Sequence, residues 1–184
     1  MTTVLYGREH LVSFDTSHAL RLRLLDGPLH LAWKHSAITS DFIAEMIALS
    51  CRLSIQRYKV VRHDIGYLTN ELIENAIKFR TQGDIVIEAL VETDSFRMRV
   101  SNFVDEETAV RFQRFLSGVT TGDPGELLIQ QIEASVAASG NTSGLGLLTL
   151  MSDYQAHLAW RFEDDGPHKR TKLETYAAMA IALS

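Results

Sequence analysis

The chain has 184 residues, of which 46% are hydrophobic and 22% are charged, and its formal net charge at pH 7 is −5. These values fit one globular domain that buries a core, and they exclude a disordered chain. The net negative charge argues against a nucleic-acid-binding protein, for which a clustered basic surface would be expected. There is no apolar run of about 20 residues and no charged-then-apolar leader, and the single Cys51 excludes an internal disulfide. We therefore expect a cytoplasmic protein with no membrane partner.

Residues 1–28 are predicted to form an N-terminal strand or hairpin extension in front of the main domain, residues 29–184. Within this extension, Leu20–Leu24 alternates leucine with arginine, a pattern typical of an edge strand. Ser95–Asn102 alternates apolar residues with arginine in the same way. This second segment is predicted to be a strand of a sheet with one solvated face.

An amphipathic helix is predicted over Ile65–Phe79. Its apolar stripe has the three-and-four spacing of one helical face and consists of Ile65, Leu68, Leu72, Ala76 and Phe79. Asp64 is predicted to cap the start of this helix, and Thr81–Gly83 to end it. The opposite side carries Asn70, Glu71, Glu74, Asn75 and Lys78. That polar face is either a solvated helix surface or a ligand-binding surface.

Three residues of the polar face have the chemistry of a Mg-ATP site. The carboxamide oxygen of Asn75 is a neutral hard ligand that suits Mg²⁺. Glu71, one turn earlier, could orient or deprotonate a hydroxyl or water that attacks the γ-phosphate. Lys78 could offset phosphate charge. Asn is also a poor residue for the middle of a helix, so Asn75 needs a reason to be there.

The interval between Asp105 and Ser139 contains two helical patterns separated by residues 120–125. The first carries Val110, Phe112, Phe115 and Leu116, and the second carries Leu127, Leu128, Ile132 and Val136. We expect both helices to pack against the sheet, with the docking of a partner as the alternative use of an apolar helix face.

A glycine-containing segment, Ser139–Leu147, leads directly into an apolar helical pattern. Gly144 and Gly146 let the backbone approach a ligand closely, and the free N–H groups at a helix start point toward an anion. The segment is neither a Walker loop nor a dinucleotide-binding motif. It is either a phosphate cradle or an ordinary glycine loop capped by Ser143.

Together, Glu71–Lys78 and Ser143–Leu147 resemble the N-box and the second glycine box of the GHKL, or Bergerat-fold, ATPases. This superfamily includes histidine-kinase catalytic domains and anti-sigma-factor serine kinases, and the latter are closest in size and layout. The resemblance implies ATP and Mg²⁺ as cofactors, with Glu71 as catalytic base and Asn75 as Mg²⁺ ligand. It also implies nucleotide contacts from Lys78 and Asn102, and phosphate contacts from the backbone of Ser143, Gly144, Leu145, Gly146 and Leu147.

The same resemblance implies an α+β fold, a two-layer α/β sandwich in which helices and a helical lid region cover one face of a mixed sheet. An early strand would lie at Leu29–Trp33, the first helix at Ser40–Arg57, and a hairpin at Asp84–Glu92 and Ser95–Asn102. The closing strands would be Ala156–Phe162 and Lys169–Tyr176. Trp33 and Trp160 would then be core residues on strands.

Two positions depart from the family pattern. The family has an Asp-x-Gly box at the end of the strand before the lid, and here Asn102 and Val104 stand at its Asp and Gly positions. The Asn102 oxygen can still accept a hydrogen bond from the adenine amine, but without charge. Thr142 stands where anti-sigma kinases have a basic residue. We therefore expect nucleotide binding with altered adenine recognition.

Three functions follow from these features. The first is an ATP-dependent serine/threonine kinase of the partner-switching type, which phosphorylates a small STAS-like antagonist protein. The second is a nucleotide-responsive interaction module without chemistry, and the third is the catalytic domain of a histidine kinase. Dimers are common among anti-sigma kinases, so a homodimer is a further expectation. His63 is expected to be a surface residue, and no histidine spacing predicts a zinc site.

Overall fold

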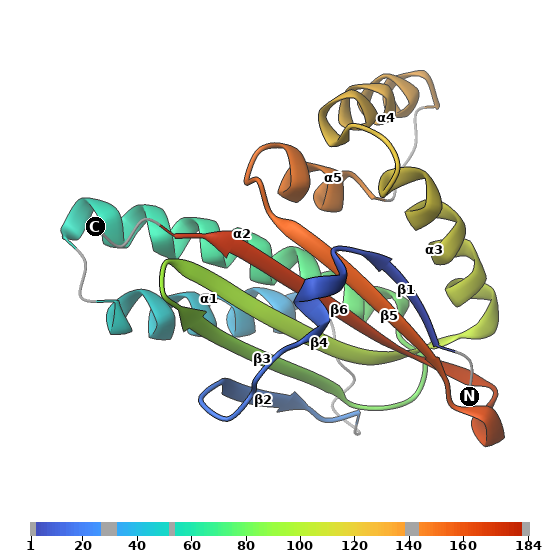
Figure 1. Ribbon diagram of the computed structural model, residues 1–184, viewed down its shortest axis with the longest axis horizontal. Coiled ribbons are helices and arrows are strands. Elements are labelled where there is room, and N and C mark those ends of the chain that lie inside the picture. The colour runs from blue at the N-terminus through green and yellow to red at the C-terminus, as the bar shows by residue number, and fades with distance from the viewer. Residues whose placement is uncertain (1–2, 27–32, 52–53, 139–143, 182–184) are drawn as a thin grey trace.

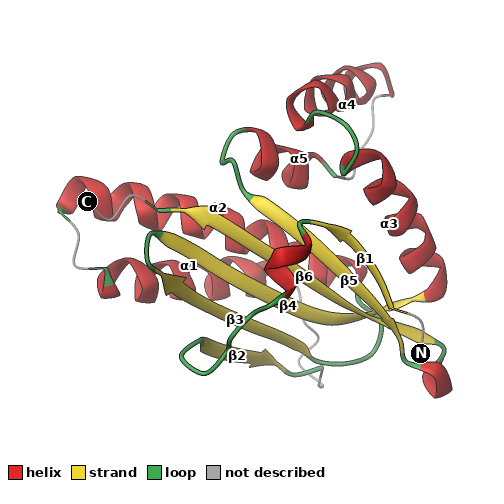
Figure 2. Ribbon diagram, in the orientation of Figure 1, coloured by secondary structure: helices red, strands yellow, loops and turns green. Residues whose placement is uncertain are grey.

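The computed structural model describes residues 3–26, 33–51, 54–138 and 144–181, and the side chains of all of these except 33, 135–138 and 167. The strands are β1 (Thr3–Gly7), β2 (Leu20–Leu24), β3 (Ile85–Glu92), β4 (Ser95–Asp105), β5 (His157–Asp164) and β6 (Arg170–Ala180). The helices are α1 (Trp33–Ser50), α2 (Ile55–Phe79), α3 (Glu106–Val119), α4 (Pro124–Ala138) and α5 (Leu145–Ser152), with two short 3₁₀ turns, η1 (Glu9–Val12) and η2 (Gly166–His168). Figure 1 shows their arrangement, and Figure 2 separates helices from strands by colour.

The strands form one six-stranded sheet in the order β1-β5-β6-β4-β3-β2. The α+β class and the two-layer arrangement expected from the sequence are confirmed. The expectation of a mixed sheet is wrong, because all five pairings between the described strands are antiparallel. Two of these pairings, β3 with β4 and β5 with β6, are hairpins, and strands joined by a short turn must run in opposite directions.

Helices α1 and α2 lie side by side on one face of the sheet (Figure 1). The predicted alternation in β4 turns Phe96, Met98 and Val100 toward these helices, and each is at most 1% exposed. The predicted apolar stripe of α2 meets them, with Ile65, Leu68 and Leu72 buried in the same cluster. Burying these apolar side chains between helix and sheet is what fixes the polar face of α2 relative to the strands.

The opposite face of the sheet is crossed by the chain between β1 and β2. Leu11 is buried there against Ala159 and Tyr176. Phe14 lies under the guanidinium groups of Arg97 and Arg99, with its ring centre 5.4 and 5.6 Å from them. Strands β1 and β2 occupy the two outer positions of the sheet, so the first part of the chain supplies both edges.

Helices α3 and α4 form where two helical patterns were predicted, but they pack differently. Helix α3 lies against the sheet, in contact with β1, β4 and β6, as expected. Helix α4 packs mainly on α5 instead (Figure 1), so the expected burial of α4 against the sheet is wrong. Helix α5 has apolar residues on more than one side. Leu147 and Leu150 belong to the main core, and Leu148, on another side of the helix, is also buried.

Three predicted elements have different bounds in the structure. Trp33 begins α1 and is not part of a strand, and the rest of the expected strand Leu29–Trp33 lies outside the described residues. The first helix, expected at Ser40–Arg57, is α1 and runs from Trp33 to Ser50. The next helix, expected to begin at Ile65, is α2 and begins at Ile55 with Ser54 as its N-cap, so Asp64 is not a cap. Helix α2 starts early because Val61, 4% exposed, extends its apolar stripe by another turn.

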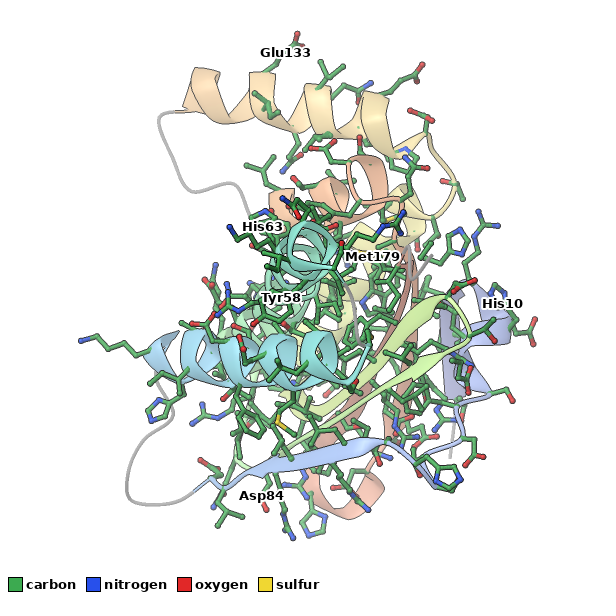
Figure 3. The ribbon with its side chains drawn as sticks, turned by 90° about the vertical axis from the view of Figure 1, so that its left-hand side faces the viewer. His10, Tyr58, His63, Asp84, Glu133 and Met179 are labelled. Carbon is green, nitrogen blue, oxygen red and sulfur yellow. The ribbon has the colours of Figure 1, made fainter. Side chains whose placement is uncertain are left out.

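The added turns of α2 also contact α1. Tyr58 of α2 donates a hydrogen bond to Glu45 of α1, and His63 is exposed, as expected (Figure 3). Among the described helices, none is both long and apolar enough to cross a membrane.

Candidate functional site

A cavity of about 400 Å³ lies between α2, the start of α5, helix α3 and the sheet. This volume is within the range of small-molecule and cofactor sites. Its described lining residues are Leu72, Asn75, Lys78, Phe79, Val104, Thr108, Arg111, Phe112, Phe115, Gly144, Leu147, Trp160, Leu173 and Thr175. The structure thus brings the two sequence segments of interest to one cavity.

Helix α2 supplies one wall. Leu72, Asn75 and Phe79 follow the helical spacing of a single face, and Lys78 lies beside them. Leu72 is buried, Asn75 is half-buried and Lys78 is exposed, with its ammonium nitrogen 5.1 Å from the centre of the Phe79 ring. The wall therefore changes from apolar at the bottom of the cavity to polar and cationic at the rim.

The Asn75 carboxamide has the properties that a Mg²⁺ ligand requires. It makes no hydrogen bond to another described residue, so its oxygen is available to a ligand. Among the described residues there is no cluster of three or more His, Cys, Asp or Glu side chains that could hold a metal ion. Ligation of Mg²⁺ by Asn75 stays a prediction.

Glu71 lies next to this cavity and contacts the start of α5. A side-chain carbon added at Gly146 would come within 2.6 Å of the Glu71 carboxyl carbon. Burial raises the pKa of Glu71, and the nearby charge of Glu74 raises it further. A carboxylate that is partly removed from water and has a raised pKa is a better proton acceptor near neutral pH than an exposed one.

An aromatic pair that the sequence did not single out joins α2 to the end of α5. The rings of Tyr67 and Tyr154 stack with centres 4.8 Å apart and planes 11° from parallel. Burial raises the pKa of Tyr67, and the charge of Glu71 raises it further. The only signal in the sequence is that Tyr67 precedes Glu71 by four residues, one helical turn.

The glycine segment begins α5 as predicted. Gly144 is the N-cap residue, with a left-handed φ of 102° that favours glycine. A side-chain carbon there would also lie 2.6 Å from Cζ of Phe115. Gly144 and Leu147 line the cavity, whereas Leu145 is half-buried beside them. Ser143 lies outside the described residues.

Asn102 occupies a different environment from the other predicted site residues. It is 3% exposed and stands on β4 opposite Leu173 of β6. Val104, two residues further along the same strand face, lines the cavity, and Asn102 is not among the described lining residues. Its contact with an adenine amine stays a prediction.

Helix α3 contributes lining residues that sequence reasoning missed. Thr108, Arg111, Phe112 and Phe115 all face the cavity, with the spacing of one helical face. This spacing can be read from the sequence. It predicts that the four residues share one face of a helix, but it does not predict that this face lines a cavity. Arg111 and Lys78 are the charged residues in the described lining, which contains no carboxylate.

The likeness of this chain to known proteins is one of fold. No protein-family model and no curated protein sequence matches it. Among solved structures, it is similar to a chain in the crystal structure of the SiaB–SiaC complex from Pseudomonas aeruginosa, with a TM-score of 0.64 and 12% sequence identity. The match covers 87% of this chain and 89% of that chain. At this identity the likeness concerns the fold.

Proposed function

We propose that this chain is an ATP-binding regulatory protein, a serine/threonine kinase of the partner-switching type that phosphorylates a small STAS-like protein. The observation that carries the proposal is that Asn75, Lys78, Gly144 and Leu147 line one cavity. Beside this cavity, Glu71 packs on Gly146 of the same α5 start. These are the parts that the sequence resemblance to GHKL ATPases assigns to nucleotide binding and catalysis.

The charge and shape of the cavity favour an anion that has an apolar part. Its inner surface is formed by Leu72, Trp160 and Leu173, and its charged groups are both cations, although the chain as a whole carries a net charge of −5. A nucleotide matches this combination of an apolar surface and cationic groups. Its base would lie against the apolar surface, and its phosphates would point toward the cations and the start of α5.

Each residue of the site then has a defined role. Asn75 would ligate Mg²⁺, which offsets phosphate charge when bound. Lys78 and the backbone N–H groups at the start of α5 would bind phosphate oxygens. Glu71 would accept the proton of the attacking serine or threonine hydroxyl, as a positioned carboxylate does in other phosphoryl transfers.

A protein substrate is supported by the fold comparison. The similar chain comes from a structure of a complex that contains two proteins. A chain with this fold is therefore able to present a surface to a second protein, which a kinase of the partner-switching type must do.

Calorimetry with ATP, with and without Mg²⁺, tests nucleotide binding. We expect the wild-type protein to bind Mg-ATP and Asn75→Ala to lose that binding. Asn70→Ala is the matched control, because Asn70 lies on the same helix and contacts Glu74 at 3.5 Å but does not line the cavity among the described residues. Undiminished binding by Asn75→Ala would refute the metal-ligand role.

A transfer assay with radiolabelled ATP and a co-encoded STAS-like protein tests the kinase activity. We expect transfer by the wild-type protein, and binding without transfer by Glu71→Gln, which keeps the size of the side chain. Failure of the wild-type protein to label any such partner would count against the kinase proposal.

A nucleotide-responsive module without chemistry is the second candidate. The observation that favours it is that Glu71 contacts Gly146 and is not among the described residues lining the cavity. The two candidates differ in one measurement: a cellular phenotype that is retained by Glu71→Gln but lost in Asn75→Ala would support the module and exclude the kinase.

A further inference from the structure

We propose that Arg111 of α3 binds the phosphate chain of the ligand together with Lys78, so that α3 forms a third wall of the nucleotide site. This inference rests on the proposed nucleotide binding. It assigns a residue from a third helix, outside the two segments that the sequence motifs identify.

Helix α3 is held in a fixed position beside the cavity. Phe112 makes edge-to-face contacts with Trp160 and Phe162, with ring centres 6.1 and 6.0 Å apart. Phe115 lies against the backbone of Gly144, where a side-chain carbon would come within 2.6 Å of its ring. Arg111 is adjacent to Phe112 on the same cavity-facing side of α3. Its long side chain therefore extends from an anchored helix.

The charge of Arg111 is available to a ligand. Arginines on the sheet are paired with carboxylates: Arg99 with Glu88, Arg161 with Glu174, and Arg97 with Glu92. The Arg111 guanidinium, in contrast, forms no ion pair or hydrogen bond with another described residue. Hydrogen bonds from Thr108 lower the pKa of Asp105, and the charge of Arg111 lowers it slightly further.

An arginine on a helix surface can pair with a carboxylate one turn away. Glu107 stands four residues before Arg111, the spacing at which such pairs form. Both residues border a shallow groove on the outer side of α3, yet no ion pair joins them. Arg111 borders the inner cavity as well. A guanidinium at the rim of a cavity with no carboxylate in its described lining is suited to a phosphate, which it can contact with two parallel hydrogen bonds.

The test is calorimetry of ATP, ADP and adenosine, all with Mg²⁺, on Arg111→Ala, Arg111→Lys and Arg114→Ala. Arg114 is the matched control, because it is an exposed arginine on the same helix that borders only the outer groove among the described residues. We expect Arg111→Ala to weaken ATP and ADP binding by about tenfold to a hundredfold, the usual effect of losing a charge-assisted hydrogen bond. Adenosine binding should not change, and Arg111→Lys should be intermediate.

The outcomes separate this inference from the proposed function. If the wild-type protein binds ATP and Arg111→Ala binds it as tightly as Arg114→Ala does, Arg111 has no role and the nucleotide site stands. Equal loss of ATP and adenosine affinity in Arg111→Ala would also overturn the inference, because it would show a steric and not an anionic contact. If the wild-type protein binds no nucleotide, the proposed function fails and the role of Arg111 fails with it. Thermal denaturation of each variant identifies any loss that is due to unfolding.

Discussion

Glu71 fills the space that a side chain at Gly146 would need. A carbon added there would lie 2.6 Å from the Glu71 carboxyl carbon. Gly146 does not have a positive φ, so at this position glycine is required for room and not for backbone conformation. The contact ties the proposed catalytic residue on α2 to the first turn of α5, and any side chain at position 146 must displace it.

We expect Gly146→Ala to move Glu71 without unfolding the protein, because the overlapping atoms are at the end of a flexible side chain. The change in the free energy of unfolding should stay within about 1 kcal/mol, since alanine also favours a helix over glycine. The pKa of Glu71 should fall toward its usual value once the carboxylate is pushed into water, and carboxyl NMR titration measures this.

Phosphoryl transfer should fall in the same variant, and combining it with Glu71→Ala should cause no further loss. Gly118→Ala is the control, because no atom lies within 4 Å of a carbon added there. An unshifted Glu71 pKa in Gly146→Ala would show that the carboxylate is not held by this contact.

Gly144→Ala should be more damaging than Gly146→Ala. Here the backbone itself is left-handed, with φ at 102°, and the added carbon would meet the Phe115 ring at 2.6 Å. We expect about 1–2 kcal/mol from the backbone and about 1–3 kcal/mol from overpacking, measured by urea denaturation. Adding Phe115→Ala should remove the overpacking and leave the backbone cost. A double variant no more destabilised than Phe115→Ala alone would contradict the backbone contribution.

The stability of the protein should depend on the charge of Glu71. Burial raises the folded-state pKa of this carboxyl above its usual 4.5, so the folded state binds a proton more tightly than the unfolded state. The contribution of this proton to the stability of the folded state is therefore complete below pH 4.5, the usual pKa of the carboxyl. It is lost as the pH rises through the folded-state pKa of Glu71. Glu71→Gln should be more stable than wild type at pH 7, and the difference should shrink toward pH 4.

Glu133→Gln provides the control for removing one negative charge, because Glu133 is exposed on α4 (Figure 3). Thermal denaturation across this pH range compares the three proteins. A Glu71→Gln variant that is less stable than wild type at pH 7 would mean that the carboxylate is stabilised by its surroundings and not desolvated.

Ser54, and not Asp64, should set the stability of the start of α2. The Ser54 hydroxyl accepts from the Arg57 N–H at 3.5 Å, so Ser54→Ala should cost about 1 kcal/mol. Asp64→Ala should be neutral or stabilising, because alanine favours a helix interior and burial already raises the pKa of the Asp64 carboxyl. Chemical denaturation of both variants decides the matter; a larger loss from Asp64→Ala would contradict this assignment.

The sequence predicted those parts of the fold that depend on local pattern. The stripe from Ile65 to Phe79, the alternation of β4 and the two helices after Asp105 are regular enough to be identified without knowing what they contact. The start of α2 was placed too late because Tyr58 and Val61 pack against other elements, and their contribution to the stripe is clear only with α1 in place.

The candidate site was predictable only where a motif marks it. Gly146 is predicted to let a ligand approach the backbone, and the group that lies against it in this structure is Glu71. The positions of Arg111 and Tyr67 at the site could not be predicted from the sequence. Their neighbours depend on how α3 and α5 pack on the rest of the fold, which no local sequence pattern encodes.

The partner strands of the two outer strands are made at different times during synthesis. Strand β2 can pair with β3 while the second half of the chain is still being made, but β1 must wait for β5, since Thr3 pairs with Glu163. Until then the β1 segment has no partner strand, and once β5 forms, its outer edge offers unpaired N–H and C=O groups to any strand that reaches it first. Correct assembly therefore requires β1 to reach the outer edge of β5 before a competing strand does.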